Sequence, residues 1–269
     1  MSGMGKGSAA TVATNLGFSY TEIQLALIVG VCGGAPRLPA DKTDGPGSTK
    51  DVFLGDVIIS NAVVQYDFGR QNSDGFVRKT AVTDILGRPN QEVRSLLAGI
   101  KAKRAHREFL ENMARHMQAL READTLWQHP KLDDVLYDSS CAHTNSSEPH
   151  PNPVRCSCLN DDPRQKTSAA RACNSGCHKN SSSIIRRRRQ HDEHSASVHI
   201  GTMASGNRVI KSAEHRAGVW DVLSCLIIKG VCYYADSHKS KTWQPYAAAA
   251  GASAAKAFLN YWRPASRQH

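Results

Sequence analysis

The stretch Leu25-Ala-Leu-Ile-Val-Gly-Val-Cys-Gly-Gly34 decides how the rest of the chain is interpreted. Five of its first seven residues are Leu, Ile or Val without alternation, which is typical of a strand buried on both faces of a sheet. The strand ends in glycines, and ligands of open α/β sheets bind beyond the carboxyl ends of strands. The stretch therefore predicts a core strand followed by a turn. A ligand site beginning at Gly30 is the alternative that the other motifs test.

Further apolar runs predict the rest of the sheet and its helices. Strands are expected at residues 51–60, continuing as extended structure to residue 68, and at residues 198–207 and 221–232. Helical spacing of apolar residues predicts a helix from residue 89 to about residue 120. Small residues after a capping Ser8 predict a helix at residues 8–16, and an alanine-rich interior predicts a final helix at residues 243–262 that packs closely on the sheet. Strands with helices between or after them predict an α/β fold, organised as a single domain over residues 1–269, with the turns gathered on one edge.

Charge and hydropathy argue against a nucleic acid or a membrane as the partner of this chain. Residues 141–190 contain nine Lys or Arg against three Asp or Glu, so six of the ten excess positive charges lie in that segment. No aromatic residues alternate with its basic run Arg186 to Arg189, which favours a solvated loop over a nucleic-acid site. No segment reaches the roughly 18 apolar residues of a membrane span, and the amino terminus lacks a signal-peptide core. We therefore expect an intracellular, cytoplasmic protein with no membrane partner.

An irregular insertion is predicted at residues 138–197, where hydrophobic periodicity disappears. Its four closely spaced cysteines, Cys156, Cys158, Cys173 and Cys177, are enough thiolates for a structural zinc site. Their spacing is not that of a standard zinc finger, so free thiols in an irregular insertion are the alternative.

Several polar or reactive side chains lie within the apolar runs. Cys32, Cys225 and Cys232 are expected to pack as small hydrophobic residues. Asp56 and Arg70 are interpreted as charges at strand ends, the commoner role for such residues, rather than as ligands.

Six short motifs occur in a fixed order along the chain. They are Gly3-Met-Gly-Lys6, Ile28-Val-Gly-Val-Cys-Gly-Gly34, Leu54-Gly-Asp-Val-Ile-Ile-Ser60, Val64-Gln-Tyr-Asp-Phe-Gly69, Ala204-Ser-Gly206 and Gly230-Val-Cys-Tyr-Tyr-Ala-Asp-Ser-His-Lys239. Together they resemble the nucleoside phosphorylase and nucleosidase superfamily of purine and uridine phosphorylases, in its fungal branch. The resemblance implies a three-layer α/β domain with a mixed central sheet flanked by helices. Here that domain is incomplete at the N-terminus, where family members have a strand pair.

The resemblance also implies a chemistry and a site. Members cleave the N-ribosidic bond of purine nucleosides, with phosphate or water as the acceptor and no cofactor, and often form homo-oligomers. The residues that the resemblance places in the substrate site are Gly30, Gly33, Gly34, Ser205, Gly206, Asn207 and Tyr233.

The sequence departs from the family where the chemistry is performed. Tyr233 stands where members carry an aspartate that contacts the base, and Asn207 replaces another aspartate. The segment ending in Met-Glu-Gly, which supplies a sugar-binding glutamate in the family, is missing between Arg216 and Ala217. No residue is therefore assigned a catalytic role. The two hypotheses are an N-ribosyl hydrolase or phosphorylase and a non-catalytic nucleoside-binding or scaffold domain, either a pseudoenzyme or a chain from an incomplete gene model.

Overall fold

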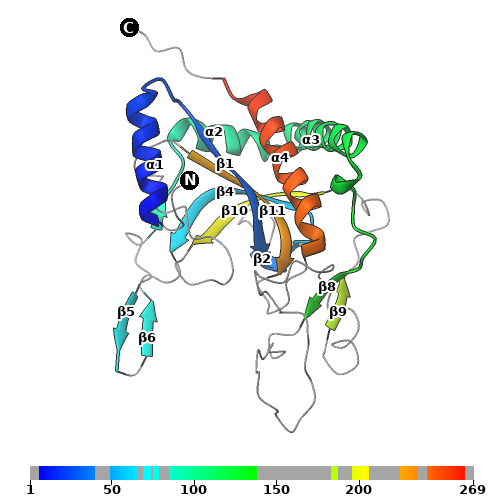
Figure 1. Ribbon diagram of the computed structural model, residues 1–269, viewed down its shortest axis with the longest axis horizontal. Helices are drawn as coiled ribbons and strands as arrows, with labels where there is room; N and C mark the ends of the chain where they lie inside the picture. Colours follow the sequence, from blue (N-terminus) through cyan, green and yellow to red (C-terminus); the bar gives the residue numbers. More distant parts are fainter. Residues whose placement is uncertain are drawn as a thin grey trace, which may run out of the picture.

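The computed structural model describes residues 6–39, 49–65, 69–73, 75–78, 85–137, 183–186, 196–205, 225–234 and 241–263. A central sheet carries the fold, with helices packed against it (Figure 1). Its strand order is β1 (Ala26–Gly34), β11 (Cys225–Tyr234), β4 (Val57–Gln65) and β10 (Val198–Ser205), and β7 (Ile85–Gly87) also pairs with β4. The strands expected from the apolar runs are thus present, and β11 is buried along its whole length.

The sheet is mixed in direction. β1 runs parallel to β11, and β10 runs parallel to β4, but β11 and β4 are antiparallel. The α/β fold class, with a mixed central sheet flanked by helices, is therefore confirmed. The carboxyl ends of β1 and β11 consequently lie at the same edge of the sheet as the amino ends of β4 and β10. The expectation that the turns after all of these strands gather on one edge was wrong, because apolar patterning does not encode strand direction.

The described residues form four α-helices: α1 (Lys6–Ser19), α2 (Gln91–Ile100), α3 (Lys103–Ala123) and α4 (Gln244–Tyr261). The single long helix predicted after residue 89 is in fact two helices. The Asn90 side chain caps the first of them by accepting a hydrogen bond from the Val93 N–H. Ala102 then adopts an extended conformation and starts α3. Gly99 weakens the end of α2, which favours a break at this point.

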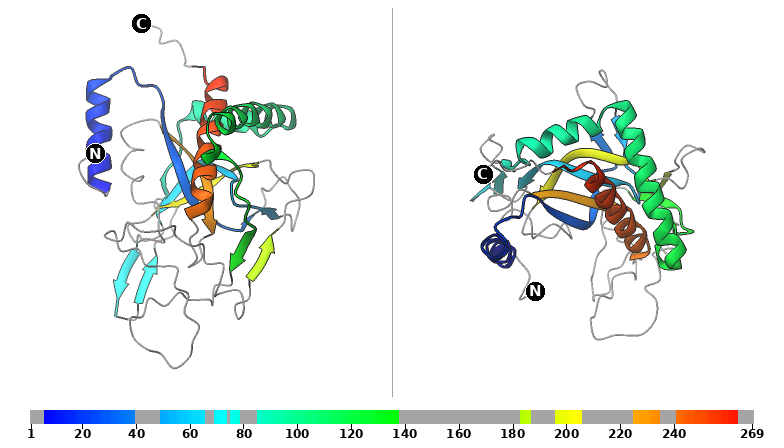
Figure 2. Two further views of the ribbon diagram at one scale, coloured as in Figure 1. Left: turned by 45° about the vertical axis from the view of Figure 1, so that its right-hand side comes forward. Right: turned by 90° about the horizontal axis from the view of Figure 1, so that it is seen from above.

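Helix α4 covers β11 and β1 at close range, and α3 lies beside α4 (Figure 2). The small residues predicted to allow this packing are at the contact. A Cβ atom added to Gly230 of β11 would overlap the backbone carbonyl of Ala247 in α4. The alanine-rich sequence of α4 therefore serves both helix formation and close approach to the sheet.

Three two-stranded antiparallel pairs lie outside the central sheet in the described part of the chain. They are formed by β2 (Arg37–Pro39) with β3 (Thr49–Asp51), β5 (Gly69–Asn72) with β6 (Gly75–Arg78), and β8 (Asp134–Tyr137) with β9 (Ser183–Arg186). β9 lies inside the stretch that was expected to be irregular, so that prediction was wrong at residues 183–186. Its antiparallel pairing with β8 brings the two ends of residues 138–182 together. Cys156, Cys158, Cys173 and Cys177 lie outside the described residues, and the zinc site stays a prediction.

The apolar cysteines behave as expected. Cys32, Cys225 and Cys232 are all buried. Burial raises the pKa of the Cys225 thiol to about 12, so this thiol stays protonated and unreactive. Among the described helices, none is long and apolar enough to cross a membrane.

His116 makes the packing between α3 and α4 sensitive to pH. Its Nε2 atom is buried and finds no hydrogen-bond partner in the part of the chain that the structure describes. Burial, then the positive charges of Lys256 and Arg115, lowers the pKa of His116 below its ordinary value of 6.5. As the pH decreases below 6.5, the unfolded chain therefore takes up a proton at this residue before the folded chain does. The free energy of unfolding consequently decreases as the pH is lowered in that range.

We expect His116→Leu to lose less unfolding free energy than the wild type when the pH falls from 7.5 to 5.5, because it removes this protonation. Urea unfolding at both pH values measures the difference. Equal losses for the two proteins would contradict the assignment.

Candidate functional site

The carboxyl ends of β1 and β11 bring the predicted glycines against side chains of β11. Gly33 lies opposite Tyr233 after a register shift that follows Cys32. Tyr233 is buried, and a Cβ atom at Gly33 would lie 2.8 Å from Cε2 of its ring. At Gly34 the corresponding distance is 2.6 Å, to Cγ1 of Val231. Both positions therefore need glycine, because neighbouring side chains of β11 occupy the space.

At Gly30, the space that a Cβ atom would need is occupied by the Lys229 side chain. The two residues are paired in the sheet, and a Cβ atom at Gly30 would lie 2.7 Å from the Lys229 Nζ. Lys229 is only 7% exposed, although lysine is rarely so deeply buried. The register shift between Lys229 and Tyr233 means that Lys229 pairs with Gly30 and Tyr233 with Gly33, so the two side chains lie on opposite faces of the sheet. A lysine inside a continuous apolar run is the sequence signal that could have pointed to it.

Of the remaining predicted site residues, Ser205 is not brought to this place. Ser205 is the last residue of β10 and pairs with Gln65, the last residue of β4. The antiparallel contact of β11 with β4 lies at the other end of that strand, from Val57 to Ile59. The register therefore does not place Ser205 beside Tyr233. Gly206 and Asn207 lie outside the described residues.

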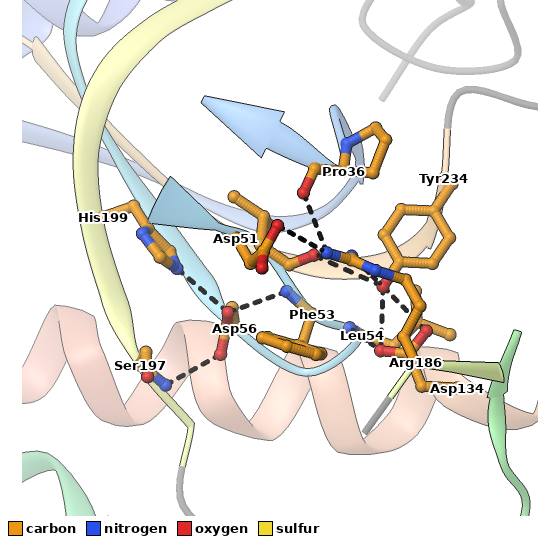
Figure 3. Close-up of polar contacts among 11 residues, drawn as sticks. Pro36, Asp51, Phe53, Leu54, Asp56, Asp134, Arg186, Ser197, His199 and Tyr234 are labelled. Atoms are coloured by element: carbon orange, nitrogen blue, oxygen red, sulfur yellow. Dashed lines mark hydrogen bonds and ion pairs between the residues drawn. The ribbon is translucent and has the colours of Figure 1, made fainter. Parts of the chain in front are cut away.

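A buried carboxylate stands where β4 begins. The Asp56 side chain has no exposed surface, and it accepts hydrogen bonds from the Phe53 N–H at 2.9 Å and the Ser197 N–H at 2.8 Å (Figure 3). The His199 Nε2 lies 2.9 Å from the Asp56 Oδ2. An ionised carboxylate only accepts hydrogen bonds, so the Nε2 atom of His199 carries the proton. Asp56 lies directly before β4, as expected of a strand-end charge, and its hydrogen bonds to Ser197 and His199 tie β4 to β10.

Arg186 of β9 fills a second polar cluster at the same edge. Its guanidinium donates to the Tyr234 hydroxyl at 2.8 Å, the Pro36 carbonyl at 3.0 Å and the Asp51 carboxylate at 3.0 Å, and also to the Val52 carbonyl (Figure 3). The side chain is 9% exposed. The expected solvated run of arginines is thus wrong at its first member, while residues 187–189 lie outside the described residues.

Asp134 of β8 completes this cluster. Its carboxylate accepts hydrogen bonds from the Leu54 N–H at 2.9 Å and from the Tyr234 hydroxyl at 2.7 Å. Burial, and then the negative charge of Asp134, raises the pKa of Tyr234, so its hydroxyl stays protonated and donates to that carboxylate. Sequence reasoning missed Arg186 and Asp134, because both act far along the chain from the strands that they contact.

The chemistry available at this edge is hydrogen bonding and stacking. The buried carboxylate of Asp56 and the half-buried carboxylate of Asp134 are each held by N–H or O–H donors, and the Asp51 carboxylate pairs with Arg186. Among the described residues there is no group of three or more His, Cys, Asp or Glu side chains that could hold a metal ion.

Comparisons with known proteins were made by sequence and by structure. No family model matches the sequence. The chain is 26% identical over 279 residues to a nucleotide-binding leucine-rich repeat (NLR)-like protein of Hyaloscypha variabilis. The match covers 95% of this chain and 23% of the relative, so the chain spans less than a quarter of that protein.

Two solved structures represent the structural neighbours. The 5'-methylthioadenosine/S-adenosylhomocysteine nucleosidase of Neisseria meningitidis, in complex with methylthio-immucillin-A, is 13% identical with a TM-score of 0.45, covering 97% of this chain and 80% of the other. The futalosine hydrolase of Helicobacter pylori is 13% identical with a TM-score of 0.44, covering 97% and 78%. The neighbours of this chain among solved structures thus include nucleosidases and a futalosine hydrolase.

Proposed function

We propose that this chain is a nucleosidase-like domain that binds a purine nucleoside at the carboxyl edge of β1 and β11 without cleaving its N-ribosidic bond. The six ordered sequence motifs support the kinship with nucleosidases. One observation carries the loss of cleavage: Tyr233, at the position where the family has an acid, is buried with its ring against Gly33.

Cleavage makes two demands that the described residues do not meet. The departing base needs a proton from an acid, and the cationic sugar needs a nearby carboxylate. A phenol is ordinarily a much weaker acid than a carboxylic acid, so Tyr233 is a poor replacement for aspartate. Asp56 and Asp134 are already held by donors from β10 and β11 and from the segment that precedes β4. Among the described residues, the edge therefore retains groups for binding a base but offers no spare acid.

The Tyr233 ring supplies a surface on which a purine can stack. Base stacking on an aromatic side chain is worth about 1–3 kcal/mol per base in nucleic-acid complexes. Because the ring is only 6% exposed, binding requires it to turn away from Gly33. We therefore propose weak nucleoside binding that depends on the ring more than on the hydroxyl of Tyr233.

Base release and binding are measured separately. We expect the purified chain to release no free base from adenosine, inosine, methylthioadenosine or ATP beyond a mock-purified control, with or without phosphate, by chromatography. Adenosine is expected to raise the melting temperature of the wild type and of Tyr233→Phe, and to have no effect on Tyr233→Ala. Release of base would overturn the loss of cleavage, and absence of any adenosine effect on the wild type would overturn nucleoside binding.

A scaffold is the second candidate, favoured by exposed apolar side chains near the β1 edge. Phe18 is 80% exposed, Tyr20 62% and Val29 40%. Exposed apolar patches mark surfaces that bind other proteins, and a second copy of this chain is one such partner. A wild type that shows neither base release nor an adenosine effect would favour this role.

A further inference from the structure

The Arg186 side chain lies in a pocket whose walls are all suited to a guanidinium group. The central carbon of the group lies over the Phe53 ring, 4.6 Å from its centroid, and over the Tyr234 ring, 5.2 Å from its centroid. Its N–H groups meet two backbone carbonyls, a carboxylate and a phenol oxygen. Aromatic rings attract cations over their faces, and the planar fork of arginine meets several acceptors at once.

The walls of this pocket come from three separate parts of the chain. Pro36 follows β1, while Asp51, Val52 and Phe53 lie in the segment that leads to β4, and Tyr234 ends β11 (Figure 3). Arg186 itself belongs to the antiparallel pair of β8 and β9, outside the central sheet. One side chain thus joins four segments at the edge where Gly33 and Tyr233 meet.

Electrostatics also favour a cation at this point. Asp51 lies 3.0 Å from the guanidinium, and Asp134 contacts the same Tyr234 hydroxyl from the other side. If Arg186 were removed, the Asp51 carboxylate, two carbonyls and the phenol oxygen would lose their shared positive partner. Repulsion among these oxygen atoms would then move Tyr234, and with it the adjacent Tyr233.

We infer that the pocket of Pro36, Asp51, Val52, Phe53 and Tyr234 is a guanidinium-binding site in its own right, filled in this chain by Arg186. Its occupancy holds the end of β11 in the position that nucleoside binding at Tyr233 requires. Arg186 is therefore a positioning residue. The second of these statements rests on the proposed function, while the first does not.

Chemical rescue tests the pocket without any nucleoside. Arg186→Ala leaves the cavity that methylguanidinium chloride can fill, and binding to the folded state raises the melting temperature. We expect millimolar methylguanidinium to raise the melting temperature of this variant by about 2–4 °C in a saturable way. Equal concentrations of sodium chloride or urea are expected to give no saturable rise.

Two variants sharpen the rescue experiment. Arg104→Ala removes an arginine that is 86% exposed, and methylguanidinium is expected to give no saturable rise there. Arg186→Lys keeps the charge without the fork and is expected to melt below the wild type. Should Arg186→Ala not fold, Arg186→Gln, which keeps a longer polar stem, takes its place in the rescue. Absence of a saturable, methylguanidinium-specific rise in the Arg186 variant, or the same rise in Arg104→Ala, would overturn the pocket.

The positioning role is read from hydrogen exchange and from adenosine affinity. We expect Arg186→Ala to speed amide exchange at residues 230–234 and to weaken adenosine binding at least about tenfold, and methylguanidinium to reverse both. Unchanged exchange at these residues would overturn the positioning role even where the pocket is rescued. If the wild type binds no adenosine, the proposed function fails, while melting and exchange still decide the inference about the pocket.

Discussion

Gly230→Ala is expected to destabilise the protein by about 3 kcal/mol or more, because overpacking at a backbone contact forces whole elements apart. The added methyl group would overlap the Ala247 carbonyl, which belongs to a helix backbone and cannot move alone. Either α4 must shift off the sheet, or β11 must bend between its two neighbouring strands. Urea unfolding at 25 °C measures the loss against the wild type.

The matched control is Gly201→Ala, also a strand glycine. No atom lies within 4 Å of a Cβ added there, so we expect a change within about 0.5 kcal/mol. Similar losses in both variants would mean that glycine in a strand, rather than contact with α4, determines the effect.

Asp56→Ala is expected to cost about 3–5 kcal/mol, the range seen when one partner of a buried charged pair is removed. The Phe53 and Ser197 N–H groups and the His199 ring would lose their acceptor inside the protein. Asp56→Asn is expected to lie between this variant and the wild type, because its amide keeps one oxygen and turns an NH₂ group toward a donor. Urea unfolding of all three proteins gives the order.

Asp133→Ala provides the control for Asp56, since Asp133 is exposed on the segment before β8. We expect its unfolding free energy to change by less than about 0.5 kcal/mol. An Asp56→Ala protein as stable as this control would show that the buried carboxylate contributes nothing to the attachment of β10.

The local pattern of the sequence was sufficient for most individual elements. Continuous apolar runs located β1 and β11, and the alanine-rich segment located α4, because burial on both faces and helix propensity both act over short distances. The break between α2 and α3 was not predicted, because the helical spacing of apolar residues continues across Ala102, where the backbone itself leaves the helical conformation.

The candidate site was harder to predict, because its contacts join distant segments. The glycines of β1 were identified, but their need for glycine comes from Lys229, Val231 and Tyr233 on a strand about 200 residues away. Arg186 lies in a run of charges that normally faces water, and only the pairing of β9 with β8 brings it to the sheet. Ser205 is separated from Tyr233 because β4 and β10 run antiparallel to β11, and strand direction cannot be predicted from residue type.

The parallel pairing of Ala26 with Cys225 has a consequence for the order in which the protein is made. At about 5–20 residues per second, a ribosome needs roughly 10–40 s between synthesising the first of these residues and the second. During that time the uncharged stretch that becomes β1 has no access to its partner strand. Early exposure of such a strand favours association with other chains. We therefore expect chaperones to bind the nascent amino-terminal half until β11 has been synthesised.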